Sequence, residues 1–152
     1  RPLLGDTPLE SVFEPLTLGL ADSFDNAGPD AFEKALKLLA DVEAHYAAMF
    51  NDIDVLLTPV LASTPPALGE IGPNAGMEGF AKVERYVGYT PLQNVAGAPA
   101  ISVPLAWSPK SGMPIGAHFS AAKGQERTLL ELAYELELAR PWISRKPRVN
   151  AA

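Results

Sequence analysis

Between Pro29 and Asn51, apolar residues recur at intervals of three and four positions, which is the period of one face of an α-helix. The members of this stripe are Phe32, Leu36, Leu39, Val42, Tyr46 and Met49. Charged residues lie off the stripe. The pattern therefore predicts an amphipathic helix that buries one side.

The residues before this helix carry signals for further helical turns. Thr7 can cap a helix, Pro8 suits the first helical position, and Glu10 completes a capping box. Pro15 has no N–H to donate, so it separates a short first turn from a second helix. Helices are therefore predicted over about residues 7–51.

The middle of the chain changes to shorter apolar patterns. Residues 54–61 form a run of branched apolar side chains, which predicts a buried strand disrupted near its end by Pro59. Residues 62–79 are rich in Pro and Gly and predict a long loop, a type that is usually functional or mobile. Residues 81–89 predict a short helix or turn. Apolar and polar residues alternate over about 98–121 around a Pro-Lys-Ser-Gly turn, which predicts an antiparallel hairpin.

A last helix is predicted over about residues 125–140, because leucines and alanines repeat on one face until Pro141 ends it. Helices, strand, loop, hairpin and helix in this order predict an α/β layer arrangement. A sheet of so few strands would leave unpaired backbone groups at an open edge. We therefore expect further strands to come from elsewhere.

Composition narrows the class of protein. The 152 residues are 47% hydrophobic and 20% charged, which fits a globular domain with a core. The net charge of −6 argues against a nucleic-acid partner, which would require clustered cations. The one basic cluster, Arg140, Arg145, Lys146 and Arg148, is interpreted as a solvated tail.

Targeting signals are not evident. No apolar run approaches the roughly 18 residues that span a bilayer, and the N-terminal ten residues do not have the pattern of a signal peptide. A cytoplasmic protein without a membrane partner is therefore expected. Because the chain begins with Arg1 rather than Met, we expect a processed chain or a fragment.

Self-contained catalytic chemistry is also not evident. The Gly-x-Ser-x-Gly elbow of serine hydrolases is missing, and the chain has two histidines. His45 lies beside the apolar stripe of a helix, where a structural or surface role is favoured. His118 lies on a strand, on the face opposite Phe119. A structural role is favoured there too, although its nearness to Ser120 leaves a cleft-facing role open.

Metal and phosphate sites have equally weak signals. The absence of cysteine excludes disulfides and thiolate ligands, and two isolated histidines do not make a zinc site. Asp52 and Asp54 are interpreted as a polar turn rather than an acid–base pair. The glycines of residues 69–76 lack the spacing of a phosphate loop. We expect no metal, no cofactor and no catalytic residue in this chain.

One motif carries a family resemblance. Residues 94–104 have the pattern N-x-x-G-x-P-A-I-S-x-P, followed by Gly-Met-Pro-Ile-Gly at 112–116 and a leucine-rich helix. Together with Glu-Pro-Leu-Thr at 14–17 and Asp-Val-Leu-Leu-Thr-Pro at 54–59, in the same order, the chain resembles the C-terminal part of amidase-signature hydrolases. Residues 89–94 and 114–119 look most like bacterial amidases of the 6-aminohexanoate-cyclic-dimer hydrolase type.

The resemblance implies a fold and a division of labour. Residues 1–152 would be the C-terminal portion of an α/β/α sandwich, with a mixed sheet and helices on both faces. The family cleaves amide bonds with two serines and a lysine in a Gly/Ser-rich segment that this chain lacks, and Ser102 belongs to the scaffold motif. The expected partner is therefore the N-terminal half of the same enzyme, and the isolated chain is expected to be inactive and to self-associate.

The resemblance also implies which loops approach a small amide substrate. The expected contacts are Thr58, Pro59, Tyr89, Thr90 and Gln93. Scaffolding is the expected role of Asn94, Gly97, Pro99 and Pro104, and the loop of residues 65–79 is either a lid or a plain mobile loop. A non-catalytic binding module is the alternative function, and a self-contained hydrolase using His118 is a third.

Overall fold

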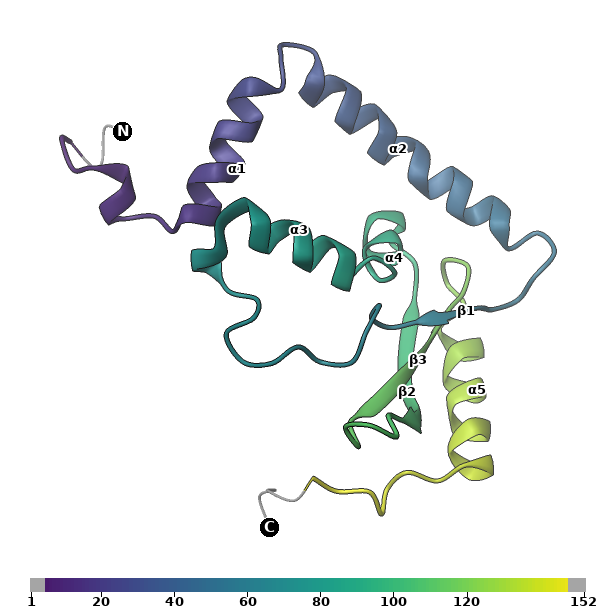
Figure 1. Ribbon diagram of the computed structural model, residues 1–152. Coiled ribbons are helices and arrows are strands. Elements are labelled where there is room, and N and C mark those ends of the chain that lie inside the picture. The colour runs from purple at the N-terminus through teal and green to yellow at the C-terminus, as the bar shows by residue number, and fades with distance from the viewer. Residues whose placement is uncertain (1–4, 148–152) are drawn as a thin grey trace.

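The computed structural model describes residues 5–147 (Figure 1). Its helical elements are η1 (Leu9–Ser11), α1 (Pro15–Asn26), α2 (Ala31–Met49), η2 (Pro73–Ala75), α3 (Gly76–Tyr86), α4 (Pro91–Ala96) and α5 (Glu126–Ala139). The strands are β1 (Leu56–Pro59), β2 (Ala100–Trp107) and β3 (Pro114–Ser120). Helices α1 and α2 form an arch that stands away from the sheet and α5.

The sheet has the order β1-β3-β2, and both pairs are antiparallel. The predicted α/β class is therefore present, but the mixed sheet of the expected sandwich would need strands beyond these three. The β2–β3 register shifts between Val103 and Ala106, where Pro104 has no N–H to donate. Helix α5 covers one face of the sheet, and a side chain of α4 bonds to β3 from the other.

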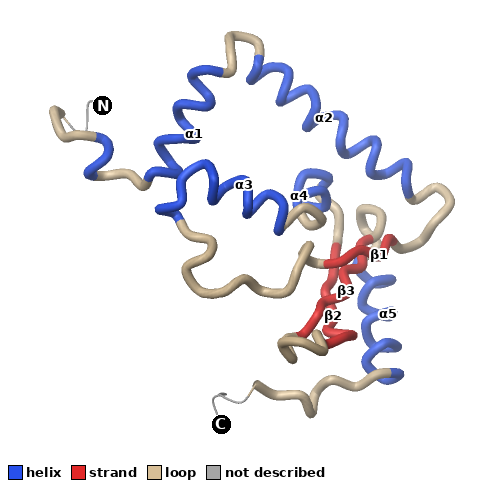
Figure 2. The backbone as a smooth tube through the Cα atoms, in the orientation of Figure 1, coloured by secondary structure: helices blue, strands red, loops and turns tan. Residues whose placement is uncertain are grey.

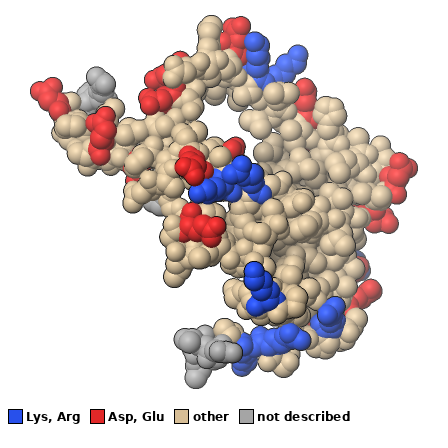
Figure 3. All heavy atoms as spheres, in the orientation of Figure 1, with Lys and Arg blue, Asp and Glu red and all other residues tan. Residues whose placement is uncertain are grey.

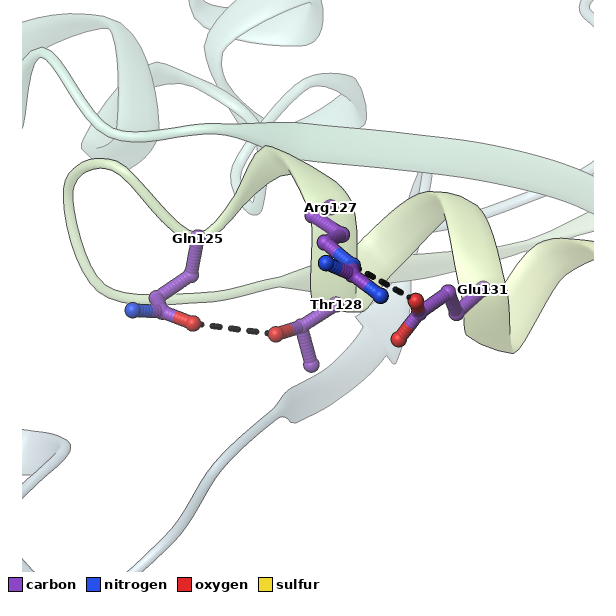
Figure 4. A network of polar contacts seen from close by, with 4 residues as sticks. All are labelled: Gln125, Arg127, Thr128 and Glu131. Atoms are coloured by element: carbon purple, nitrogen blue, oxygen red, sulfur yellow. Dashed lines mark hydrogen bonds and ion pairs between the residues drawn. The ribbon is translucent and has the colours of Figure 1, made fainter.

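The core lies between the sheet and α5. Its buried members are Val103, Phe119, Ala121 and Leu129. The two-residue period of the strands and the helical period of α5 meet here, as the sequence pattern predicts. At the start of α5, Thr128 Oγ1 donates to Gln125 Oε1 at 2.9 Å and Arg127 Nε donates to Glu131 Oε1 at 2.7 Å, both at the surface (Figure 4).

Three local predictions differ from the structure. The capped helix expected near Thr7 is only the 3-10 turn η1, which has no side-chain cap. The loop expected over residues 62–79 ends at η2, and α3 follows it (Figure 2). Packing explains α3: an ideal Cβ on Gly19 of α1 would lie 2.8 Å from Met77 Cγ, so the two helices approach closely. This contact outweighs the weak helix propensity of Gly76 and Gly79.

Helix α4 is the third difference, since no helix was expected around residues 91–96. Pro91 occupies its first turn, and Gly97 ends it with a left-handed φ of +63°. Both features are typical helix boundaries, and they were readable from the sequence. Six residues are too few to show a helical period, which is why the pattern did not indicate the helix.

Much apolar surface stays exposed. The chain has 11439 Å² of accessible surface, whereas a folded monomer of 16.2 kDa has about 7,500 Å². On α2, the predicted stripe is real, but Phe32, Leu36 and Leu39 are 58%, 50% and 49% exposed. Figure 3 shows an opening between the arch and the rest of the molecule. The chain alone therefore leaves exposed the apolar face of α2 that the sequence pattern predicts to be buried.

Candidate functional site

The face of the sheet away from α5 is polar. Because side chains alternate along β3, Phe119 points into the α5 core while His118 and Ser120 point to the other side. The register places His118 directly between Thr58 on β1 and Ser102 on β2. We call Thr58, Ser102, His118, Ser120 and Gln93 the polar face.

His118 is the titratable group of this face, and it is 5% exposed. Its Nδ1 lies 3.0 Å from Thr58 Oγ1, a hydrogen-bond distance. Burial lowers the pKa of His118, so the imidazole is neutral at physiological pH. A neutral imidazole has one donor and one acceptor, so it fixes the direction of the Thr58 hydroxyl rather than supplying a charge.

Gln93 joins α4 to the end of β3. With its amide nitrogen facing two backbone carbonyls, it donates to Tyr89 O at 3.1 Å and to Thr90 O at 3.2 Å. Its amide oxygen then accepts from Ser120 Oγ at 3.2 Å. Gln93 is 4% exposed and Ser120 is fully buried, so this bridge is shielded from water. It holds the carbonyls of residues 89 and 90 against the sheet.

The five predicted substrate residues gather near this polar face in two groups. Thr58 is half-buried and paired with His118, and Pro59 follows it at the exposed end of β1. Tyr89 is 41% exposed, and Thr90 lies between it and α4. The polar atoms of the Gln93 side chain are all hydrogen-bonded to backbone carbonyls of this chain and to Ser120. Its geometry favours positioning over direct contact.

Ser102, His118 and Ser120 are the members of this face that the sequence did not assign to the site, and the last two lie on β3. The alternation along β3 places both opposite Phe119, so the signal was present. It could not reveal that Thr58 and Gln93 would be their partners, because those pairs are distant in sequence. On the same face of the sheet, a Cβ on Gly116 would lie 2.6 Å from Val60 Cγ2 and 2.8 Å from Ser102 Oγ, so a larger residue there would displace these side chains.

The polar face offers hydrogen-bonding groups, but among residues 5–147 it contains no activated serine nucleophile. Among residues 5–147, no serine hydroxyl is hydrogen-bonded to a histidine, because His118 is paired with Thr58 and His45 Nδ1 with the Asp41 carbonyl. Within the same range, no three His, Asp or Glu side chains gather as metal ligands. In the part of the chain that the structure describes, no helix has the length and apolar character to cross a bilayer.

Several known proteins that are similar to this chain are named as amidases or amide hydrolases. The Amidase family model matches residues 15–130. A Mycobacterium leprae protein named as an amidase, AmiC, is 43% identical over 93% of this chain and 30% of its own length. The 6-aminohexanoate-cyclic-dimer hydrolase of Pseudomonas sp. NK87 is 37% identical over 63% of this chain and 21% of its own length.

The same relationship holds in three dimensions. A solved structure of 6-aminohexanoate cyclic dimer hydrolase complexed with substrate superimposes with a TM-score of 0.80 at 29% identity. The superposition covers 95% of this chain and 31% of that one. The chain thus spans about a third or less of the length of the relatives it matches. The resemblance of the Asn94–Pro104 motif is confirmed, and the chain belongs to the Amidase family.

Proposed function

We propose that this chain supplies the C-terminal scaffold and one wall of the substrate cleft of an enzyme that hydrolyses carboxamide bonds, linear or cyclic. Family membership supports the reaction class. The exposed apolar surface is the observation that supports a scaffold role for this chain, with the catalytic residues in other polypeptide. The stripe of α2 and the excess of accessible area correspond to faces that the remaining polypeptide of an amidase would cover.

The reactive serine pair and lysine of the family would come from that remaining polypeptide. Ser102, in the family motif, lies beside His118 in the register but is not hydrogen-bonded to it among the described contacts. Without a base in contact, its hydroxyl is a weak nucleophile at neutral pH. The chain alone is therefore expected to be inactive.

In this proposal, the loops around the polar face form the cleft wall. Thr58 and Pro59 approach from the end of β1, and Tyr89 and Thr90 approach from the turn before α4. His118 orients the Thr58 hydroxyl, and Gln93 holds the turn. A small amide substrate suits such a wall, because hydroxyl and phenol groups bind amide carbonyls and N–H groups by hydrogen bonds.

The alternative is a non-catalytic binding module. One observation favours it: the sheet and α5 enclose a core of their own, with Ala121 and Leu129 at 0% and 2% exposure. This core would allow the sheet and α5 to stay folded without α1 and α2. A binding module, however, would not explain why the apolar stripe of α2 is exposed.

A chimera separates the two functions. The segment of AmiC that precedes the matching region would be joined to this chain, and release of amine or ammonia from simple linear and cyclic amides would be measured. The proposal predicts turnover by the chimera and none by the chain alone. A folded but inactive chimera, or turnover by the purified chain that His118→Ala abolishes, would contradict it.

A further inference from the structure

Both tryptophans of the chain line one cavity, which shares no lining residue with the polar face. Trp107 and Trp142 meet between the turn end of the β2–β3 hairpin and the segment after α5. The cavity has a volume of about 450 Å³, within the roughly 300–1,000 Å³ of small-molecule sites. Gln93 bonds to the opposite end of the hairpin, roughly 20 Å along the strands.

The walls are aromatic and apolar, but the rim is cationic. Met113 and the rings of Pro104 and Pro114 complete the apolar lining. The guanidinium carbon of Arg145 lies 4.0 Å from the centre of the Trp107 ring, a cation–π contact. Lys146 lines the same cavity.

These two cations have no carboxylate partner among residues 5–147, although the chain carries a net charge of −6. Basic side chains gather at this end of the molecule (Figure 3). A guanidinium stacked on a ring keeps its in-plane N–H groups available, and their geometry matches the two oxygens of a carboxylate.

We propose that this cavity binds small aryl carboxylates. The indole rings would stack on the aromatic ring of the ligand, and Arg145, assisted by Lys146, would pair with its carboxylate. A neutral aryl amide would lose the ionic pairing, and an aliphatic acid would lose the stacking. The site is separate from the proposed cleft, so it does not depend on the proposed amide hydrolysis.

The tryptophans report on this cavity directly, because the chain has no others. Benzoate would be titrated into the 152-residue chain while the indole fluorescence is followed, with benzamide and cyclohexanecarboxylate as comparisons. The expected result is a saturable change with benzoate and about tenfold weaker binding of the other two molecules. Trp107→Phe and Trp142→Phe each leave one reporter, and both variants are expected to respond.

Arg145→Gln tests the charge pairing and is expected to weaken benzoate binding about tenfold. Arg127→Gln is the matched control, since Arg127 is also exposed but pairs with Glu131 on α5. Equal affinity for benzoate and benzamide, equal behaviour of the two arginine variants, or a change that never saturates would overturn the proposal. Loss of benzoate binding in the AmiC chimera would do so too, because it would mean that the remaining polypeptide occupies this cavity.

Discussion

At the scale of the residue, the informative feature is that polar side chains are buried with partners. A buried polar group costs free energy unless it is hydrogen-bonded, so each pair limits how the loops can sit. His118 is paired with Thr58, and Ser120 with Gln93. Tyr46 is the exception within the described residues: its hydroxyl is buried without a partner.

Replacement of Gln93 by Leu should destabilise the chain. The change removes the amide and leaves the Tyr89 and Thr90 carbonyls and the Ser120 hydroxyl buried without it. We expect the free energy of unfolding to fall by about 2 kcal/mol. Urea denaturation gives the value. Gln125→Leu is the control, because the Gln125 side chain accepts a hydrogen bond from Thr128 at the exposed start of α5. Similar losses in both variants would count against the bridge.

The buried imidazole predicts a pH dependence of stability. Because the pKa of His118 is lowered in the folded state, the unfolded chain takes up a proton first as the pH falls. The contribution of neutral, buried His118 to folding stability is therefore complete above about pH 6.5 and is lost progressively below that value. We expect the free energy of unfolding to decrease from pH 7 to pH 5 through this residue.

Chemical denaturation at each pH would measure that decrease. His118→Gln should remove part of it, whereas His45→Gln should leave it intact, since His45 is exposed. If the two variants show the same pH dependence as the parent chain, the proposed burial effect is wrong.

At the scale of the element, the sequence predicted the parts that show a clear two-residue or 3.6-residue period. The hairpin and α5 follow from period-2 and period-3.6 patterns that meet in one core. Helix α3 begins earlier than the short helix or turn expected over residues 81–89, because its first turn packs against α1. Helix α4 was not predicted because it is too short. Gln93 was expected to lie in a loop, whereas the structure places it in the short helix α4 with its side chain buried. The stripe of α2 was predicted correctly, but its exposure was not readable from α2 alone.

Mutations in the exposed stripe of α2 should change the free energy of unfolding much less than mutations in the buried face of α5. The double variant Leu36→Glu/Leu39→Glu should change the free energy of unfolding by no more than about 0.5 kcal/mol, because both side chains are exposed. Leu129→Ala should cost about 3 kcal/mol, since Leu129 is 2% exposed in the core. Urea denaturation compares them. A large loss in the α2 variant would mean that the stripe is already buried in solution.

At the scale of the whole molecule, the accessible surface area is larger than expected for a folded monomer of this mass. The excess over a folded monomer is larger than the roughly 1,600 Å² that a standard protein interface buries in total. Among residues 5–147, the exposed part of the α2 stripe and the outer edges of β1 and β2 lack covering elements. Relatives about three times as long have the polypeptide to provide them.

The central claim is that this surface receives the remaining part of an amidase. A dye that fluoresces on exposed apolar surface tests it most directly, when the chain is titrated with the AmiC segment that precedes the matching region. The account predicts strong dye fluorescence from the chain alone and its loss at one equivalent of that segment, with a weaker loss for Leu36→Glu/Leu39→Glu. A well-behaved monomer that binds no dye, or fluorescence that the added segment leaves unchanged, would contradict the account.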